Sequence, residues 1–264
     1  MTTNPYAAPK AAVADDTVIA SADFVPGGQS REAGRGWAWI ASAWDLFKRQ
    51  PGLWIGIWVL MAVIFMAAAF IPFLGSLLTM LFWPVFMAGI AVGCAALDEG
   101  KELELGHLFA GFRERVGPLI GVGALYLGAV VIITLAMVLV AGAGMFAVIG
   151  FGGGDNPAAA AAAGGVTVLL AVLVMLALML PVIMAIWFAP TLVVFQQMGP
   201  LDAMKMSFFG SLKNILPFLV YGLVGLGLAV AATIPLLLGW LVLGPVVLAS
   251  VYTAYRDIYF KPRA

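Results

Sequence analysis

The densest group of ionisable side chains in this sequence lies in ALDEGKELELGHLF, residues 96–109. It contains four carboxylates and the only histidine: Asp98, Glu99, Glu102, Glu104 and His107. Carboxylates near a histidine bind metal ions or act as general acid and base. The same residues also suit a solvated turn, with acidic side chains placed at a helix N-terminus where the dipole favours them. We expect the turn, because no second histidine exists to complete a typical zinc site.

Other signatures of chemistry are missing from the sequence. It has no GxSxG, Walker loop, HExxH or CxxC motif. The long uncharged segments have no ionisable residue near their centres, which argues against a proton-coupled transport mechanism. The sequence therefore predicts no catalytic residue, no metal and no cofactor.

The elements around this group are strongly apolar. Of 264 residues, 64% are hydrophobic and 10% are charged, whereas soluble domains are roughly 25% charged. Such a chain cannot bury its apolar surface in its own interior, so we expect lipid to surround it. The formal net charge is zero, which argues against nucleic-acid binding because that requires a basic face.

Uncharged runs predict six membrane-spanning helices. No Asp, Glu, Lys or Arg occurs in residues 51–97, 116–154, 156–201 or 214–255, and about 20 apolar residues cross a bilayer. Turn signals at 71–75 and 234–239 divide the first and last runs, and a predicted loop at 150–165, which holds Asp155, divides the middle. The sequence predicts an all-α polytopic membrane protein. Its approximate spans are 53–71, 76–97, 118–141, 166–195, 216–235 and 239–258.

Basic residues predict the orientation of these spans. All 13 Lys and Arg lie in the N-terminal region, residues 98–115, residues 202–213 or the C-terminal end. The positive-inside rule therefore places both termini in the cytoplasm. Residues 1–34 are rich in Ala, Pro and Gly and have no signal-peptide pattern, so we expect a disordered cytoplasmic tail before a membrane domain at 35–264.

One pattern occurs three times: AWDLFKRQPGLWI (43–55), LFAGFRERVGPLI (108–120) and SFFGSLKNILPFL (207–219). Apolar residues at helical spacing, such as Trp37, Ile40, Trp44 and Phe47, predict an amphipathic interfacial helix before each proline. We thus expect three units, each an interfacial helix plus a helical hairpin. The predicted interface basic residues are Lys48, Arg49, Arg113, Arg115, Lys205 and Lys213. The predicted helix-bending prolines of the returning spans are Pro84, Pro181, Pro190 and Pro245.

The stretches GRGWAWIASAWDLFKRQPGLW (34–54) and LDEGKELELGHLFAGFR (97–113) carry a family resemblance. They resemble uncharacterised proteobacterial multi-pass inner-membrane proteins with a GxGWxWI opening and an EGxELxxxxLFxGF loop. More distantly, the repeated plan is similar to the membrane domain of glycerophosphodiester phosphodiesterases, whose soluble catalytic domain this chain lacks. The resemblance implies topology and location only.

Three functional hypotheses follow. The first is a non-catalytic inner-membrane protein that interacts with membrane lipids or other membrane proteins, in envelope organisation or assembly. The alternative is a transporter or channel for a lipid or small neutral solute, which internal repeats and proline-broken helices favour. The third is an intramembrane enzyme that uses residues 98–107.

Overall fold

The computed structural model describes residues 23–151 and 157–261, and in these residues every regular element is helical. The order short helix, long helix, long helix occurs three times along the chain. The equivalence of the three units as repeats stays a prediction. The first unit is α1 (Arg35–Arg49), α2 (Pro51–Ala69) and α3 (Leu74–Asp98). The second is η2 (Leu105–Phe109) with α4 (Ala110–Glu114), α5 (Val116–Phe151), and α6 (Pro157–Trp187) with α7 (Ala189–Gln196). The third is α8 (Pro200–Leu212), α9 (Ile215–Thr233) and α10 (Trp240–Tyr259).

Prolines mark where long helices begin. Pro51 is the first residue of α2, and Pro118 and Pro217 lie at the third positions of α5 and α9. A proline in the first turn removes no helical hydrogen bond, because those N–H groups have no intrahelical acceptor. The proline in each repeated stretch therefore lies in the first turn of the long helix.

Within residues 23–151 and 157–261, six helices are long and apolar enough to cross a membrane, which confirms the predicted number. Their bounds are Pro51–Ala69, Leu74–Asp98, Val116–Phe146, Gly164–Gln196, Ile215–Thr233 and Trp240–Tyr259. The α5–α6 hairpin is longer than predicted. The loop expected at 150–165 is wrong at both ends, because α5 continues to Phe151 and α6 begins at Pro157. The alanines after Pro157 explain the early start, since alanine has the highest helix propensity. Asp155 lies outside the described residues.

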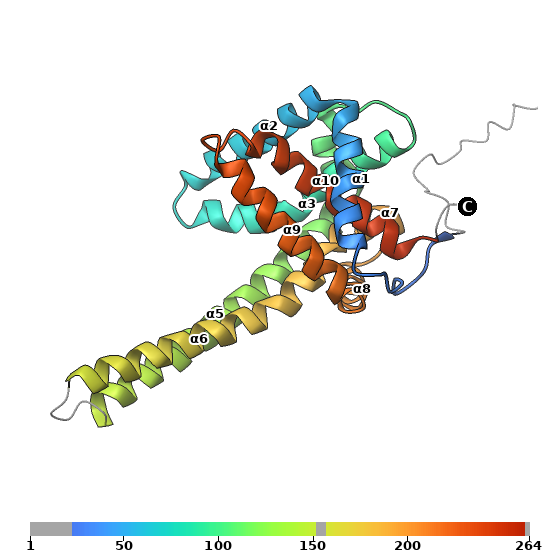
Figure 1. The fold of residues 1–264 in the computed structure, drawn as a ribbon. Coiled ribbons are helices and arrows are strands. Elements are labelled where there is room, and N and C mark those ends of the chain that lie inside the picture. The colour runs from blue at the N-terminus through green and yellow to red at the C-terminus, as the bar shows by residue number, and fades with distance from the viewer. Residues whose placement is uncertain (1–22, 152–156, 262–264) are drawn as a thin grey trace, which may run out of the picture.

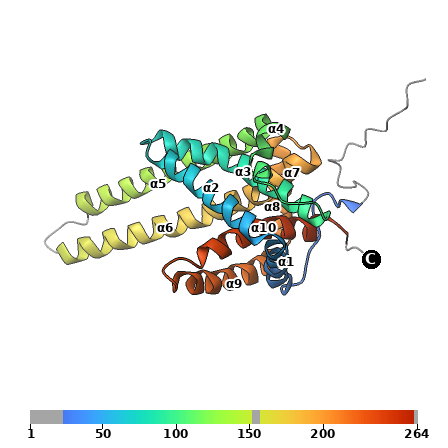
Figure 2. The same cartoon turned by 90° about the horizontal axis from the view of Figure 1, so that it is seen from above.

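The short helices gather at one end of the molecule, as Figure 2 shows. We call this the charged end. At the opposite, bare end lie the connections at 70–73 and 234–239, which contain no charged residue. The α5–α6 hairpin extends beyond the other two hairpins in the bare-end direction (Figures 1 and 2).

Each short helix packs on a returning helix that belongs to a different unit. The η2–α4 segment contacts α3, α8 contacts α6 and α7, and α1 contacts α10 and α9. The units therefore interlock in a cycle that joins the first helix of the chain to the last.

The packed core centres on α3 and α10. Over an apolar stretch of 18 residues in each of these helices, 72% and 61% of the residues are buried. The corresponding fraction is 6% for both α5 and α6. The exposed side chains of α5 and α6 are mostly apolar, for example Ile132 and Leu139. Such a surface requires an apolar solvent.

Candidate polar site at the charged end

Residues 23–34 form an ordered segment, which we call the N-terminal strap. Phe24 pairs with Phe260 in an isolated antiparallel bridge, and the Val25 N–H donates to the Tyr259 carbonyl at 2.8 Å. The Gln29 N–H donates to the Ile258 carbonyl at 2.9 Å. The prediction of a disordered tail over 1–34 is therefore wrong for residues 23–34. Residues 1–22 of that tail lie outside the described part of the chain.

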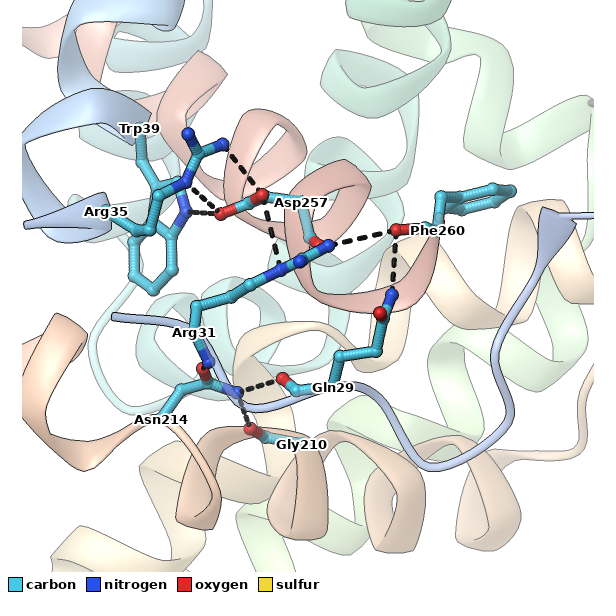
Figure 3. Close-up of polar contacts among 8 residues, drawn as sticks. All are labelled: Gln29, Arg31, Arg35, Trp39, Gly210, Asn214, Asp257 and Phe260. Atoms are coloured by element: carbon cyan, nitrogen blue, oxygen red, sulfur yellow. Dashed lines mark hydrogen bonds and ion pairs between the residues drawn. The ribbon is translucent and has the colours of Figure 1, made fainter. Parts of the chain in front are cut away.

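Asp257, near the end of α10, is the main acceptor for this region (Figure 3). Its carboxylate accepts hydrogen bonds from Arg35 Nε at 2.9 Å, Arg35 Nη2 at 2.7 Å and Trp39 Nε1 at 2.8 Å. Arg31 forms an ion pair with it at 3.4 Å and donates to the Asp257 and Phe260 carbonyls. The hydrogen bond to Asp257 raises the pKa of Arg35. This carboxylate therefore joins the strap and α1 to α10.

Asn214, between α8 and α9, holds the strap from the other side. Its Oδ1 accepts the Arg31 N–H at 2.8 Å, and its Nδ2 donates to the carbonyls of Gln29 at 2.9 Å and Gly210 at 2.8 Å (Figure 3). Asn214 is fully buried. Its amide thus satisfies backbone groups of the strap that would otherwise be buried without partners.

The strap, α1, α3 and α10 surround an open cavity of about 390 Å³, which we call the polar pocket. That size lies within the range of small-molecule sites. Basic residues outnumber acidic ones, five to three, in its lining. The lining residues are Arg31, Arg35, Ser42, Asp45, Leu46, Arg49, Asp98, Tyr252, Thr253, Arg256, Asp257, Phe260 and Lys261.

Asp98 lies on the α3 side of this pocket. Arg256 Nη2 is 3.7 Å from Asp98 Oδ2, and the Tyr252 hydroxyl donates to the same oxygen at 3.4 Å. The Arg256 guanidinium also lies over the Phe260 ring, 4.9 Å from its centroid. Arg49 Nη1 donates to the Leu97 carbonyl near the end of α3. A guanidinium there complements the negative end of the helix dipole.

The predicted acidic group is divided by the structure. Asp98 lines the polar pocket, whereas Glu99 forms an ion pair with Lys101 at 2.9 Å and Glu102 is exposed. Glu104 and His107 act locally: the Glu104 N–H donates to His107 Nδ1 at 3.0 Å and caps η2. Among the residues that the structure describes, no group of three or more His, Cys, Asp or Glu side chains is placed to hold a metal ion.

The His107 cap predicts that stability falls in acid. Burial lowers the pKa of His107 below its ordinary value of 6.5, so the folded protein favours the neutral ring that accepts the Glu104 N–H. The stabilisation is complete above pH 6.5 and is lost as the pH falls through the folded-state pKa. We expect His107→Ala, which removes the acceptor, to be less stable than the parent at pH 7.5, by about 1 kcal/mol, and the difference to shrink at pH 5.5. Detergent-solubilised unfolding measured at both pH values tests this. A difference that does not change with pH would contradict it.

All six predicted interface residues except Arg115 are exposed, and they fall into two groups by whether they contact the backbone of another segment. Lys48, Arg113 and Lys205 are exposed, and Lys48 pairs with Asp45 at 2.8 Å. The other three contact the backbone of neighbouring segments. Arg49 binds the Leu97 carbonyl, Arg115 donates to Gln197 and Met198, and Lys213 Nζ donates to the Gly27 carbonyl at 2.9 Å.

The apolar residues predicted on one face of the first short helix divide between the protein interior and its surface. Ile40 and Phe47 are buried, whereas Trp37 and Trp44 are 54% and 42% exposed, so the predicted interfacial position of this helix stays a prediction. Trp39 is buried instead, because its indole N–H reaches Asp257 while its ring packs on Phe218. The structure places Pro84, Pro181 and Pro245 inside α3, α6 and α10, whereas Pro190 lies in the first turn of α7.

The chain is similar to a probable inner membrane protein of Burkholderia thailandensis, with 29% identity over 202 residues that cover 75% of this chain and 74% of that protein. No protein-family model matches the chain. No solved structure matches it. The proposed likeness to phosphodiesterase membrane domains stays a prediction. Together, the relative and the six apolar helices show a multi-pass integral protein of the inner membrane.

Proposed function

We propose that this protein is a non-catalytic inner-membrane protein that interacts with anionic lipids at its charged end, and that this end faces the cytoplasm. The observation that carries the proposal is the location of the basic side chains. In the described residues, the connections at the bare end have no charge, while Lys48, Arg113 and Lys205 are exposed on the short helices of the charged end. Lysine and arginine near the membrane surface attract anionic headgroups by about 1 kcal/mol each.

The exposed tryptophans of α1 support the same location. Trp37 and Trp44 are large amphipathic side chains on a short helix that precedes a membrane span. Tryptophan prefers the level of the lipid headgroups, where its ring meets apolar chains and its N–H meets water. We therefore propose that α1 lies at the membrane interface.

The polar pocket lies at the charged end and not between the proline-containing helices at mid-membrane, so it does not favour the transporter hypothesis. Binding to other membrane proteins also stays a prediction.

Thiol labelling tests the orientation. In a Cys94→Ala background, single cysteines are introduced by Phe73→Cys at the bare end and Glu102→Cys at the charged end; both positions are exposed. We expect a membrane-impermeant maleimide added to whole cells to label the first variant only. Permeabilised cells, in which both label, provide the control. Labelling of Glu102→Cys in intact cells would show that the charged end faces the periplasm, which contradicts the proposed orientation.

Lipid retention tests the interaction. The full chain is purified in mild detergent, and the retained lipids are quantified by mass spectrometry against the composition of the source membrane. We expect enrichment of anionic lipids, reduced in a variant that combines Lys48→Gln, Arg113→Gln and Lys205→Gln. Retained lipid that matches the bulk composition in both proteins would contradict the proposal.

A further inference from the structure

The carboxylates that line the polar pocket neutralise only some of its basic side chains. Asp257 binds Arg31, Arg35 and Trp39, and Asp45 pairs with Lys48, which lies outside the lining. The lining itself retains two basic groups more than acidic ones, since five minus three is two. Excess positive charge in a concave site raises the local concentration of anions.

Arg256 is the basic group best placed to bind an anion. Its side chain is only 19% exposed, and its ion pair with Asp98 is 3.7 Å long, which is too long for a good hydrogen bond. This long contact and the face of the Phe260 ring position the guanidinium. The ring holds the guanidinium plane in place. A guanidinium fixed in this way keeps N–H donors available to the pocket.

Two further cations complete the arrangement. Arg35 uses Nε and Nη2 for Asp257, and its side chain is still 48% exposed. Lys261 lies two residues after the end of α10 and is exposed, and its backbone N–H donates to the Asp23 carbonyl at 3.1 Å. These groups come from α1 and from the C-terminal end. Only the folded arrangement therefore brings them to one pocket.

We propose that the polar pocket binds a phosphate group, with Arg35, Arg256 and Lys261 as donors to its oxygens. Phosphate matches the planar, forked N–H groups of arginine, which bind two oxygens at once. The excess of two positive charges suits a phosphate monoester or diester. The phosphate belongs either to a lipid headgroup or to a free ion. The lipid source rests on the proposed function, which places α1 at the headgroup level, and basic pockets between helices near the cytoplasmic surface hold such headgroups.

The experiment compares two variants of the full chain that lose the same charge. Arg256→Gln removes the donor in the pocket, and Lys101→Gln removes an exposed cation outside it. Each protein is titrated with inorganic phosphate in detergent. Each is also inserted into nanodiscs of phosphatidylcholine with or without phosphatidylglycerol, and bound lipid is counted by native mass spectrometry. We expect Arg256→Gln to weaken binding about tenfold or more, because a hydrogen bond to a charged group contributes about 1.5–3 kcal/mol. Lys101→Gln should change it less than about twofold.

A second variant protects the test against misfolding. Arg256→Lys keeps the charge but loses the fork, so we expect an intermediate affinity with an unchanged unfolding midpoint. Dependence on Arg256 in the lipid arm alone identifies a headgroup, and dependence in the phosphate arm alone identifies a free ion; both support the pocket. Equal losses of binding affinity in Arg256→Gln and Lys101→Gln overturn the phosphate pocket. That result leaves the proposed function intact, because retention of anionic lipid by the exposed basic residues is measured separately. No binding by the parent protein in either arm overturns the inference, and lack of anionic-lipid retention separately refutes the proposed function.

Discussion

Asp257→Ala is expected to lower the free energy of unfolding by about 3–5 kcal/mol. The carboxylate is only 11% exposed. It accepts hydrogen bonds from Arg35 and Trp39 and forms an ion pair with Arg31. Removing it leaves the buried Trp39 indole N–H without its acceptor, so that group carries its full desolvation cost. It also removes the negative charge beside the largely buried Arg31 guanidinium, which keeps only its backbone carbonyl acceptors. The effect is measured by denaturant or thermal unfolding of the purified protein in detergent, followed by tryptophan fluorescence.

Asp45→Ala is the matched control for that variant. Asp45 also forms an ion pair, with Lys48 at 2.8 Å, but its side chain is 66% exposed. Exposed pairs of this kind stabilise by less than about 1 kcal/mol. A loss in Asp257→Ala no larger than the loss in Asp45→Ala would show that Asp257 does not join the strap, α1 and α10.

Gly36→Leu is expected to lower the free energy of unfolding by about 3 kcal/mol. A Cβ atom at Gly36 would meet the Pro217 carbonyl oxygen and the Tyr221 nitrogen. Both are backbone atoms of α9, so neither rotates away, and α1 must separate from α9. Overpacking of this kind typically costs 1–3 kcal/mol, and leucine adds three carbons beyond Cβ. Unfolding in detergent measures the loss.

Gly34→Leu provides the comparison within the same segment. No atom lies within 4 Å of a Cβ built on Gly34, so the substitution adds the same side chain without a clash. We expect a change of less than about 0.5 kcal/mol. Equal losses in the two variants would indicate that the close approach of α1 and α9 is not maintained in solution.

The membrane architecture was predictable because it depends on local chain properties. The uncharged runs and the turn signals predict six membrane-spanning helices, and the described part of the chain contains six helices of sufficient length and apolarity. The length of the α5–α6 hairpin does not follow from the sequence, because glycine and Asn-Pro at 150–157 favour a loop. The alanines at 158–163 favour a helix that begins at Pro157.

The polar site was largely missed, because it depends on contacts between residues far apart in the chain. Asp98 is a candidate from the sequence, but Asp257 and Asn214 are not, since their partners in the N-terminal region are far away in the chain. Arg31 and Arg35 lie at the boundary of a region whose composition indicates disorder. One signal was available: an Arg-Asp pair at 256–257 directly after an uncharged run of 42 residues, 214–255. Buried charges require partners, and Arg31 and Arg35 are among the arginines that have no predicted role.

The cyclic packing of the short helices has a consequence for biosynthesis. The surface that covers α1 is formed by α9 and α10, which leave the ribosome last. Until then, Trp39 has neither the Asp257 carboxylate nor the Phe218 ring beside it. Helix α1 is therefore synthesised early but packs on its native neighbours, α9 and α10, only after nearly the whole chain has been translated. A nascent chain truncated before α10 should insert its first hairpins in the membrane and yet expose α1 to protease.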